Sequence, residues 1–160
     1  MRKTLFPLLA LCLLLSGCGG TPSADASAEF FAMDTVMHLE TPGLSDPAAV
    51  TAGRDAVEAL EALLSRTDGE SEISRLNGAD GRETPLSYPT AALLAAARDY
   101  SLATDSAFDP TVAPVMDAWG FTREERHVPD PDTLADTLAL VDWRALTVAE
   151  DDASARLEEP

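Results

Sequence analysis

The side chains best suited to chemistry lie in residues 105–121, with the sequence DSAFDPTVAPVMDAWGF. Asp109 and Pro110 form a pair typical of a helix start, because the carboxylate accepts hydrogen bonds from the following amides and proline needs no partner at the first helical position. Such a turn can also offer backbone amides and a polar side chain to a ligand beside Phe108, which we expect to be buried. Pro114 would then interrupt the helix. Two roles stay open for Asp109: a cap alone, or a cap that also contacts a ligand.

The other polar residues give little support for metal or nucleophile chemistry. His38 and His127 are far apart in the sequence and lack the spacing of zinc ligands. The chain has no glycine-rich phosphate loop and no Gly-x-Ser-x-Gly segment. Asp130 and Asp132 are explained most simply as helix starts. Met33 falls within an expected strand, where methionine is more often part of a core than of a contact.

The first twenty residues predict export and a lipid anchor. A basic start is followed by an apolar run from Leu5 to Leu15, which is too short to span about 30 Å of bilayer. Residues 1–17 are therefore expected to be a signal peptide. Cys18 follows Leu-Ser-Gly as in a bacterial lipobox, so we expect it to be acylated; the alternative is a plain signal with a chance cysteine. Acyl chains would hold the protein on the extracytoplasmic side of the bacterial cell membrane, in the periplasm or on the outer face.

The charge of the chain excludes one class of partner. It carries 11 basic and 28 acidic residues, a net charge of −17. Loss of residues 1–17 would leave nine arginines and no lysine against the same 28 acidic residues, a net charge of −19. A surface of this kind repels nucleic acid, so we predict no nucleic-acid partner. An anionic ligand would need backbone amides, arginine or a metal ion.

Elements that could position these residues follow from periodicity, proline and turn residues. Residues 18–29 are small and polar, typical of a flexible tether, and 30–160 are long enough for one domain. Within the domain we expect a mixed α/β (α+β) fold with a strand, several helices and a C-terminal β-hairpin closed by a tight acidic turn. The expected elements are a strand at 30–40 with its odd-numbered residues on one face, helices at 46–66, 71–76, 89–104 and 130–140, and the hairpin from 145 to 159.

Four segments in this order resemble the FAD:protein FMN transferases, the ApbE-type flavin transferases. They are AMDTVM, LEALLSRTDGESEISRLN, AFDPTVAPVMDAWGF and PDPDTLADTLALVDWRALTV. The resemblance covers about residues 30–150 and is most specific at 106–121. It implies Mg²⁺-dependent cleavage of the FAD pyrophosphate, transfer of FMN to a threonine hydroxyl of a target flavoprotein, and release of AMP.

The resemblance also implies which residues contact FAD. They are Met33, Thr67, Ala107, Phe108 and Asp109. The family has Met-Gly-Thr where this chain has Met-Asp-Thr, and it often has tyrosine where this chain has Thr67. A threonine cannot stack on a flavin or adenine ring as tyrosine does.

Length is the largest departure from the family, which continues for well over a hundred residues beyond the hairpin. The catalytic residues and the metal ligands are expected in that second half. We therefore expect this chain to be the N-terminal portion of such a transferase, incomplete for catalysis by itself. The alternatives are an FAD pyrophosphatase and a non-catalytic lipoprotein that binds a flavin or another ligand.

Overall fold

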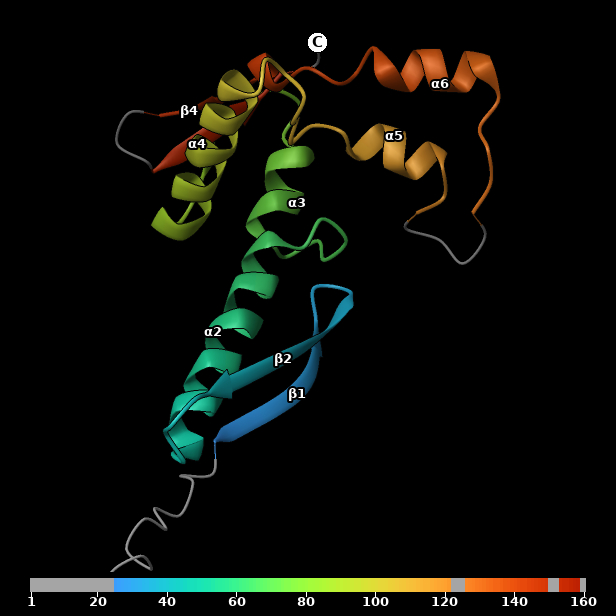
Figure 1. Cartoon of the computed structure of the whole chain (residues 1–160). Coiled ribbons are helices and arrows are strands. Elements are labelled where there is room, and N and C mark those ends of the chain that lie inside the picture. The colour runs from blue at the N-terminus through green and yellow to red at the C-terminus, as the bar shows by residue number, and fades with distance from the viewer. Residues whose placement is uncertain (1–24, 122–125, 150–152, 159–160) are drawn as a thin grey trace, which may run out of the picture. The chain divides into compact units, whose positions relative to one another are not determined.

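The computed structural model describes residues 25–121, 126–149 and 153–158 (Figure 1). The chain divides into two compact units, Met1–Ala56 and Val57–Pro160. The expected signal peptide, Cys18, most of the tether and the acidic turn of the C-terminal hairpin lie outside the described residues. Within the described residues, no helix is both long enough and apolar enough to cross a membrane.

The first unit contains a β-hairpin. Strand β1 (Ala26–Ala32) pairs antiparallel with β2 (Thr35–Thr41). Met33 and Asp34 form the connection, with φ angles of 51° and 57°. Two-residue hairpin turns of type I′ need positive φ at both central positions, and aspartate tolerates this conformation better than most residues. The Met-Asp pair therefore makes a tight turn without glycine.

The hairpin corrects the prediction of one strand over 30–40. The chain reverses in the middle of that range, and residues 26–29, which we expected in the tether, belong to β1. The two-residue turn also changes which residues share a face, since Phe30 lies opposite Met37 in the register. Phe30 is buried, whereas Phe31 is 68% exposed. The predicted odd-numbered inner face holds in β2 and fails in β1.

Helix α2 (Pro47–Leu64) begins as predicted. Asp46 precedes it, and its Oδ1 accepts a hydrogen bond from the amide of Ala48 at 2.9 Å. Within the first unit, α2 contacts the hairpin through Arg54 and the Phe30 ring. The Arg54 guanidinium lies 5.7 Å from the centroid of the Phe30 ring, a cation–π distance.

The second unit combines short helices with a three-stranded antiparallel sheet of order β3-β5-β4. The prediction of a mixed α/β fold is confirmed, as are the helices near 71–76, 89–104 and 130–140 and the C-terminal hairpin. Strand β3 was not predicted, because two residues are too few to show a period. The elements are α3 (Glu72–Asn77), β3 (Thr84–Pro85), α4 (Tyr88–Ala103), α5 (Ala113–Ala118), α6 (Pro131–Leu138), the 3-10 helix η1 (Trp143–Ala145), β4 (Leu146–Val148) and β5 (Ser154–Leu157).

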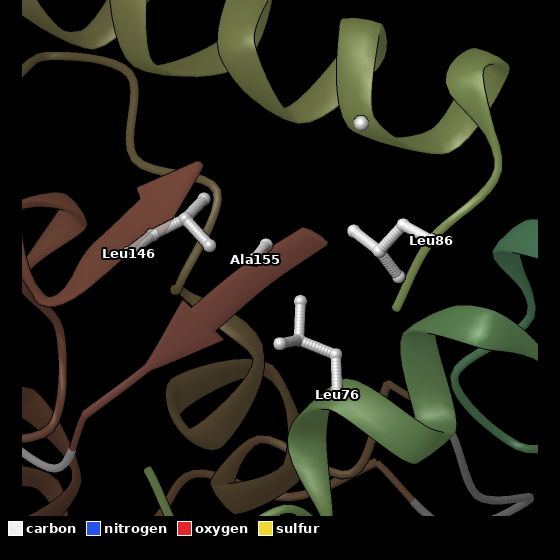
Figure 2. Close-up of a cluster of buried hydrophobic side chains, with 5 residues drawn as sticks. Leu76, Leu86, Leu146 and Ala155 are labelled. Atoms are coloured by element: carbon white, nitrogen blue, oxygen red, sulfur yellow. The ribbon is translucent and has the colours of Figure 1, made fainter. Parts of the chain in front are cut away.

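The core of this unit lies between α3, α4 and the sheet. Figure 2 shows apolar side chains from these elements facing one another, which removes their surface from water at roughly 25 cal/mol per Å². The buried cluster consists of Leu76, Leu86, Ala91, Leu146 and Ala155. Helix α4 contributes Ala91 to this cluster, and its partly buried Leu94 packs against it.

Helix α5 is short and unbroken, contrary to the prediction. It begins at Ala113, and Pro114 falls in its first turn, where a missing N–H disrupts no hydrogen bond of the helix. Val112 precedes the helix as its N-cap residue. Asp109 therefore lies too early in the chain to cap α5, and this part of the prediction is wrong.

The Trp-Gly-Phe sequence forms the end of α5. The amides of Gly120 and Phe121 donate to the carbonyls of Asp117 and Met116 at 3.0 and 3.1 Å. This is the hydrogen-bond pattern of a Schellman motif, which needs a left-handed residue just after the helix. Gly120 supplies it with a φ of 72°. Helices α5 and α6 then lie side by side (Figure 1).

Candidate functional site

The segment that carries the predicted site begins with a strained turn after α4. Asp105 and Ser106 both have positive φ, 52° and 64°. Left-handed conformations are uncommon for residues other than glycine, and they often lie at functional sites. The amide of Ser106 donates to the Ser101 carbonyl at 2.9 Å, and the amide of Ala107 donates to the Thr104 carbonyl at 3.1 Å. The turn is therefore bonded directly to the last turn of α4.

Asp109 is a hydrogen-bond acceptor for two separate parts of the chain. Its Oδ1 accepts from the amide and the hydroxyl of Thr111 at 2.8 and 2.6 Å. Its Oδ2 accepts from the amide of Trp143 at 3.0 Å. The first pair of bonds forms a local turn, and the third crosses 34 residues to η1. Asp109 thus connects the turn to η1 instead of capping a helix.

Trp143 also binds the other end of the same segment. Its indole Nε1 donates to the Ser106 hydroxyl at 3.0 Å, and the side chain is only 8% exposed. The Arg144 guanidinium lies 4.7 Å from the centroid of the Trp143 ring. We call the group Ser106, Asp109 and Trp143 the Trp143 clamp. The clamp fixes both ends of residues 106–109 to Trp143: Ser106 is bonded to its indole and Asp109 to its backbone amide.

Phe108 is exposed, contrary to the expectation that it is buried. The side chain is 46% exposed, because the neighbouring side chains at 106 and 109 are the ones directed to Trp143. The Phe108 amide donates to the Thr104 hydroxyl at 3.1 Å. The amides of residues 106, 107 and 108 therefore all donate hydrogen bonds within the chain. The prediction that this turn offers free backbone amides to a ligand is wrong at these three positions. The segment presents an aromatic ring, which suits a flat apolar ring system better than a phosphate.

Thr67 lies in the loop that follows α2. The Ser65 hydroxyl accepts from the amides of Thr67 and Asp68 at 3.3 and 3.1 Å. Next to it, the guanidinium of Arg66 forms a two-point ion pair with the Asp117 carboxylate, one bond of which measures 3.0 Å. Asp117 belongs to α5, which follows residues 106–109 in the chain. The ion pair therefore connects the loop that contains Thr67 to α5.

Four of the five predicted FAD-contact residues belong to the second unit. Ala107, Phe108 and Asp109 are consecutive, and Thr67 lies in a loop ion-paired to α5. Met33 forms the hairpin turn of the first unit and is 42% exposed. Their contact with FAD stays a prediction. Cys18, the predicted lipidation site, lies outside the described residues.

Sequence reasoning missed two residues that organise this unit. One is Trp143, whose partners are too distant in sequence to be read from a pattern. The other is Glu72, a carboxylate only 9% exposed that accepts from the Ser87 amide at 3.0 and 3.1 Å and from the Ser87 hydroxyl at 2.9 Å. Burial on its own would raise the pKa of Glu72, but hydrogen bonds from Thr90 and Ser87 and the charge of Arg75 outweigh it and lower the pKa.

The described residues do not supply a metal centre. No group of three or more His, Cys, Asp or Glu side chains among them is arranged to hold an ion. Two cavities have linings that include no residue of the clamp. One of about 230 Å³ lies on the sheet and is lined by Glu83, Thr147 and Arg156 among others, and one of about 460 Å³ lies in the first unit. Among the described residues, the candidate site is the exposed surface around Phe108.

Comparison with known proteins shows the family of this chain. The family model described as the ApbE family matches residues 33–160. A Klebsiella pneumoniae protein named FAD:protein FMN transferase is 34% identical over 139 residues, which cover 80% of this chain and 39% of the relative. A Haemophilus influenzae protein of the same name is 29% identical over 160 residues, or 92% of this chain and 46% of the relative. The chain spans less than half the length of these relatives.

Solved structures show the same fold. The Thermotoga maritima ApbE protein superposes with a TM-score of 0.76 at 21% identity, covering 84% of this chain and 45% of that one. The flavin transferase ApbE from Vibrio cholerae gives a TM-score of 0.67 at 23% identity, covering 84% and 46%. The family match includes the hairpin turn, the Thr67 loop, the Trp143 clamp and the C-terminal sheet. The chain belongs to the ApbE family.

Proposed function

We propose that the protein acts as an FAD:protein FMN transferase. The observation that carries the proposal is the family match over residues 33–160, which includes the clamped segment that exposes Phe108. The curated relatives are named for this reaction. Since the chain covers less than half of their length, the proposal concerns the reaction to which this part of the protein contributes.

The proposed reaction exchanges one phosphate bond for another. The threonine hydroxyl of a target flavoprotein attacks the phosphorus on the FMN side of the FAD pyrophosphate. A new P–O bond forms to the threonine oxygen, the anhydride bond breaks, AMP leaves, and the hydroxyl proton is released. Nothing is oxidised or reduced in this transfer. Catalysis then depends on positioning and on stabilising charge at the phosphate oxygens.

The residues of this chain would contribute mainly to binding the flavin. Phe108 presents an aromatic face, and stacking of a nucleobase on such a side chain typically contributes about 1–3 kcal/mol. Met33, Thr67 and Ala107 are the further proposed contacts. Asp109 stays a proposed contact as well, although its carboxylate already accepts three hydrogen bonds within the chain.

Mg²⁺ would supply neutralisation of the pyrophosphate charge. The described residues contain no cluster suited to it. The proposal of a magnesium requirement therefore rests on the family resemblance, and we assign no residue of this chain to the ion.

A transfer assay tests the proposed function. The intact protein is incubated with FAD, Mg²⁺ and a flavoprotein domain that accepts FMN on threonine, and covalent flavin is followed by in-gel fluorescence and mass spectrometry. We expect labelled acceptor and AMP in equal amounts, with no label on an acceptor whose threonine is replaced by alanine. Phe108→Ala is expected to weaken FAD binding by about tenfold, equivalent to about 1.4 kcal/mol. Tyr88→Ala removes an exposed aromatic at the start of α4 and serves as the matched control.

The same assay separates the other possibilities. AMP and free FMN without labelled acceptor would identify a pyrophosphatase. FAD binding without AMP would identify a non-catalytic flavin-binding protein. Either result would contradict the proposed transferase function.

We further propose that Cys18 carries a lipid anchor that holds the protein at the extracytoplasmic face of the bacterial cell membrane. The Leu-Ser-Gly-Cys sequence supports this proposal. Mass spectrometry of the membrane-extracted protein is expected to show a mature N-terminus at Cys18 with a diacylglyceryl group. An unmodified N-terminus at another residue would contradict it.

A further inference from the structure

We infer that Ser106 and Trp143 are positioning residues for flavin binding, and that they act by fixing the direction in which Phe108 projects. The inference rests on the proposed function, because it concerns the same surface. Neither residue is among the predicted FAD contacts. Their effect would pass through the clamped segment at residues 106–109.

The hydrogen bonds of the segment fix it at both ends. At one end, the Ser106 hydroxyl accepts from the Trp143 indole at 3.0 Å. At the other, Asp109 accepts from the Trp143 amide at 3.0 Å. Both donors belong to one buried residue, so the two ends of the segment cannot move independently of each other.

The amides between these two points are fixed to a different element. Those of Ala107 and Phe108 bond to the carbonyl and the hydroxyl of Thr104, at the end of α4. The base of the Phe108 side chain is therefore held from two sides, by α4 and by η1. An aromatic side chain that protrudes from a fixed base loses little freedom on binding a ligand, which favours affinity.

The energetics of Ser106 point to orientation more than to stability. A left-handed conformation costs an ordinary L-residue about 1–2 kcal/mol, whereas glycine adopts it freely. One hydrogen bond contributes about 0.5–1.5 kcal/mol net. Because the two quantities nearly cancel, serine has little net advantage over glycine in stability. Its distinctive effect is the bond that directs the segment.

Three variants test the inference in the intact protein. Ser106→Ala removes the hydroxyl and keeps the strain, Ser106→Gly removes both, and Trp143→Phe removes the indole N–H while the backbone bond to Asp109 can remain. Isothermal titration with FAD gives the dissociation constant, and urea unfolding gives the stability. We expect each variant to weaken FAD binding about fivefold, consistent with one lost hydrogen bond. Ser106→Gly is expected to do so with an unchanged unfolding midpoint.

Two further measurements make the test specific. A double variant, Ser106→Gly with Trp143→Phe, is expected to bind FAD no more weakly than either single variant, because both remove the same bond. Ser154→Ala removes a serine hydroxyl that donates to Glu83 in the sheet and is expected to leave FAD affinity unchanged.

The outcomes distinguish this inference from the proposed function. If the unaltered protein binds FAD and Ser106→Gly binds it equally well, the positioning role is overturned while the proposed function stands. If the loss of FAD affinity is proportional to the loss of unfolding free energy across the variants, the clamp has only a structural role, and this result also overturns the inference. If the unaltered protein fails to bind FAD, both the proposed function and the inference are overturned.

Discussion

Replacing Glu72 with alanine is expected to lower the free energy of unfolding by about 3 kcal/mol. The carboxylate is buried and accepts hydrogen bonds from the amide and the hydroxyl of Ser87. Alanine would leave these donors without an acceptor, and an unsatisfied buried group costs about 1–3 kcal/mol, more when the lost partner is charged. Urea unfolding of the variant and the unaltered protein measures the difference.

The size of this effect follows from what Glu72 does for helix α4. The first amides of a helix have no partner within the helix. Ser87 is the N-cap residue of α4, yet within the described residues its side chain makes no capping hydrogen bond to the helix. Glu72 on α3 accepts the hydrogen bond of the Ser87 amide, which is one of these first amides, and its negative charge is favourable at a helix N-terminus. One carboxylate thus joins α3 to the start of α4.

Two variants control the Glu72 experiment. Glu72→Gln keeps the shape and one acceptor oxygen, so we expect a loss intermediate between the unaltered protein and Glu72→Ala. Glu70→Ala removes an exposed carboxylate two residues before Glu72, ahead of α3, and is expected to change the stability little. A loss below about 0.5 kcal/mol in Glu72→Ala, the range of ordinary surface substitutions, would contradict the capping role.

The stabilisation by Glu72 should also depend on pH. Its pKa is lowered from 4.5 in the folded protein, because hydrogen bonds and Arg75 outweigh the burial that would raise it. A carboxyl group of this kind contributes stability above its unfolded pKa and loses it as the pH falls through the folded value. The difference in unfolding free energy between the unaltered protein and Glu72→Ala is therefore expected to be constant near neutrality and to shrink below pH 4.5.

Asp109→Ala is expected to lower the free energy of unfolding by about 2 kcal/mol. The change removes the acceptor for the Thr111 amide and hydroxyl and for the Trp143 amide. The Trp143 amide loses its partner beside a buried side chain, where water cannot easily replace it. Urea unfolding measures the loss, and near-ultraviolet circular dichroism reports whether Trp143 keeps its fixed environment.

Asparagine at position 109 shows which role the carboxylate has. In a simple helix cap, asparagine serves about as well as aspartate. Asp109 instead accepts at both oxygens, and asparagine would turn an NH₂ group toward either Thr111 or Trp143. We therefore expect Asp109→Asn to lose about 1–2 kcal/mol. Asp130→Asn is the matched control: Asp130, the N-cap of α6, accepts from the Thr133 amide at Oδ1 and from the Thr133 hydroxyl at Oδ2, and a hydroxyl can turn to accept from the NH₂ group of asparagine, whereas the Trp143 amide cannot. Equal behaviour of the two variants would contradict the bridging role of Asp109.

The sequence alone determined the elements whose signals are local. Helices α2 and α6 begin at Asp-Pro pairs, because the capping carboxylate and the fixed φ of proline act on neighbouring residues only. The C-terminal hairpin followed from alternation on either side of an acidic turn. The family resemblance followed from four short segments in order, of which residues 106–121 are the most specific. Such segments can be recognised in a sequence because the order of their residues does not depend on the fold around them.

The tertiary structure decided where the chain turns without glycine and which side chains face inward. Met33 and Asp34 look like strand residues in a pattern of alternating polarity, yet they form the hairpin turn. The pairing of β1 with β2 imposes that turn, and it moves Phe31 to the exposed face. Strand β3 exists only because β5 pairs with it.

The tertiary structure also decided the partners of the candidate site. Asp109 and Ser106 bond to Trp143 across 34 and 37 residues, and Glu72 reaches Ser87 across 15. Such bonds depend on packing that brings distant elements together, and residue spacing does not encode them. A sequence can therefore predict that Asp109 accepts hydrogen bonds from nearby amides. Only the folded chain shows that its second oxygen holds Trp143, and that Phe108 is thereby left exposed.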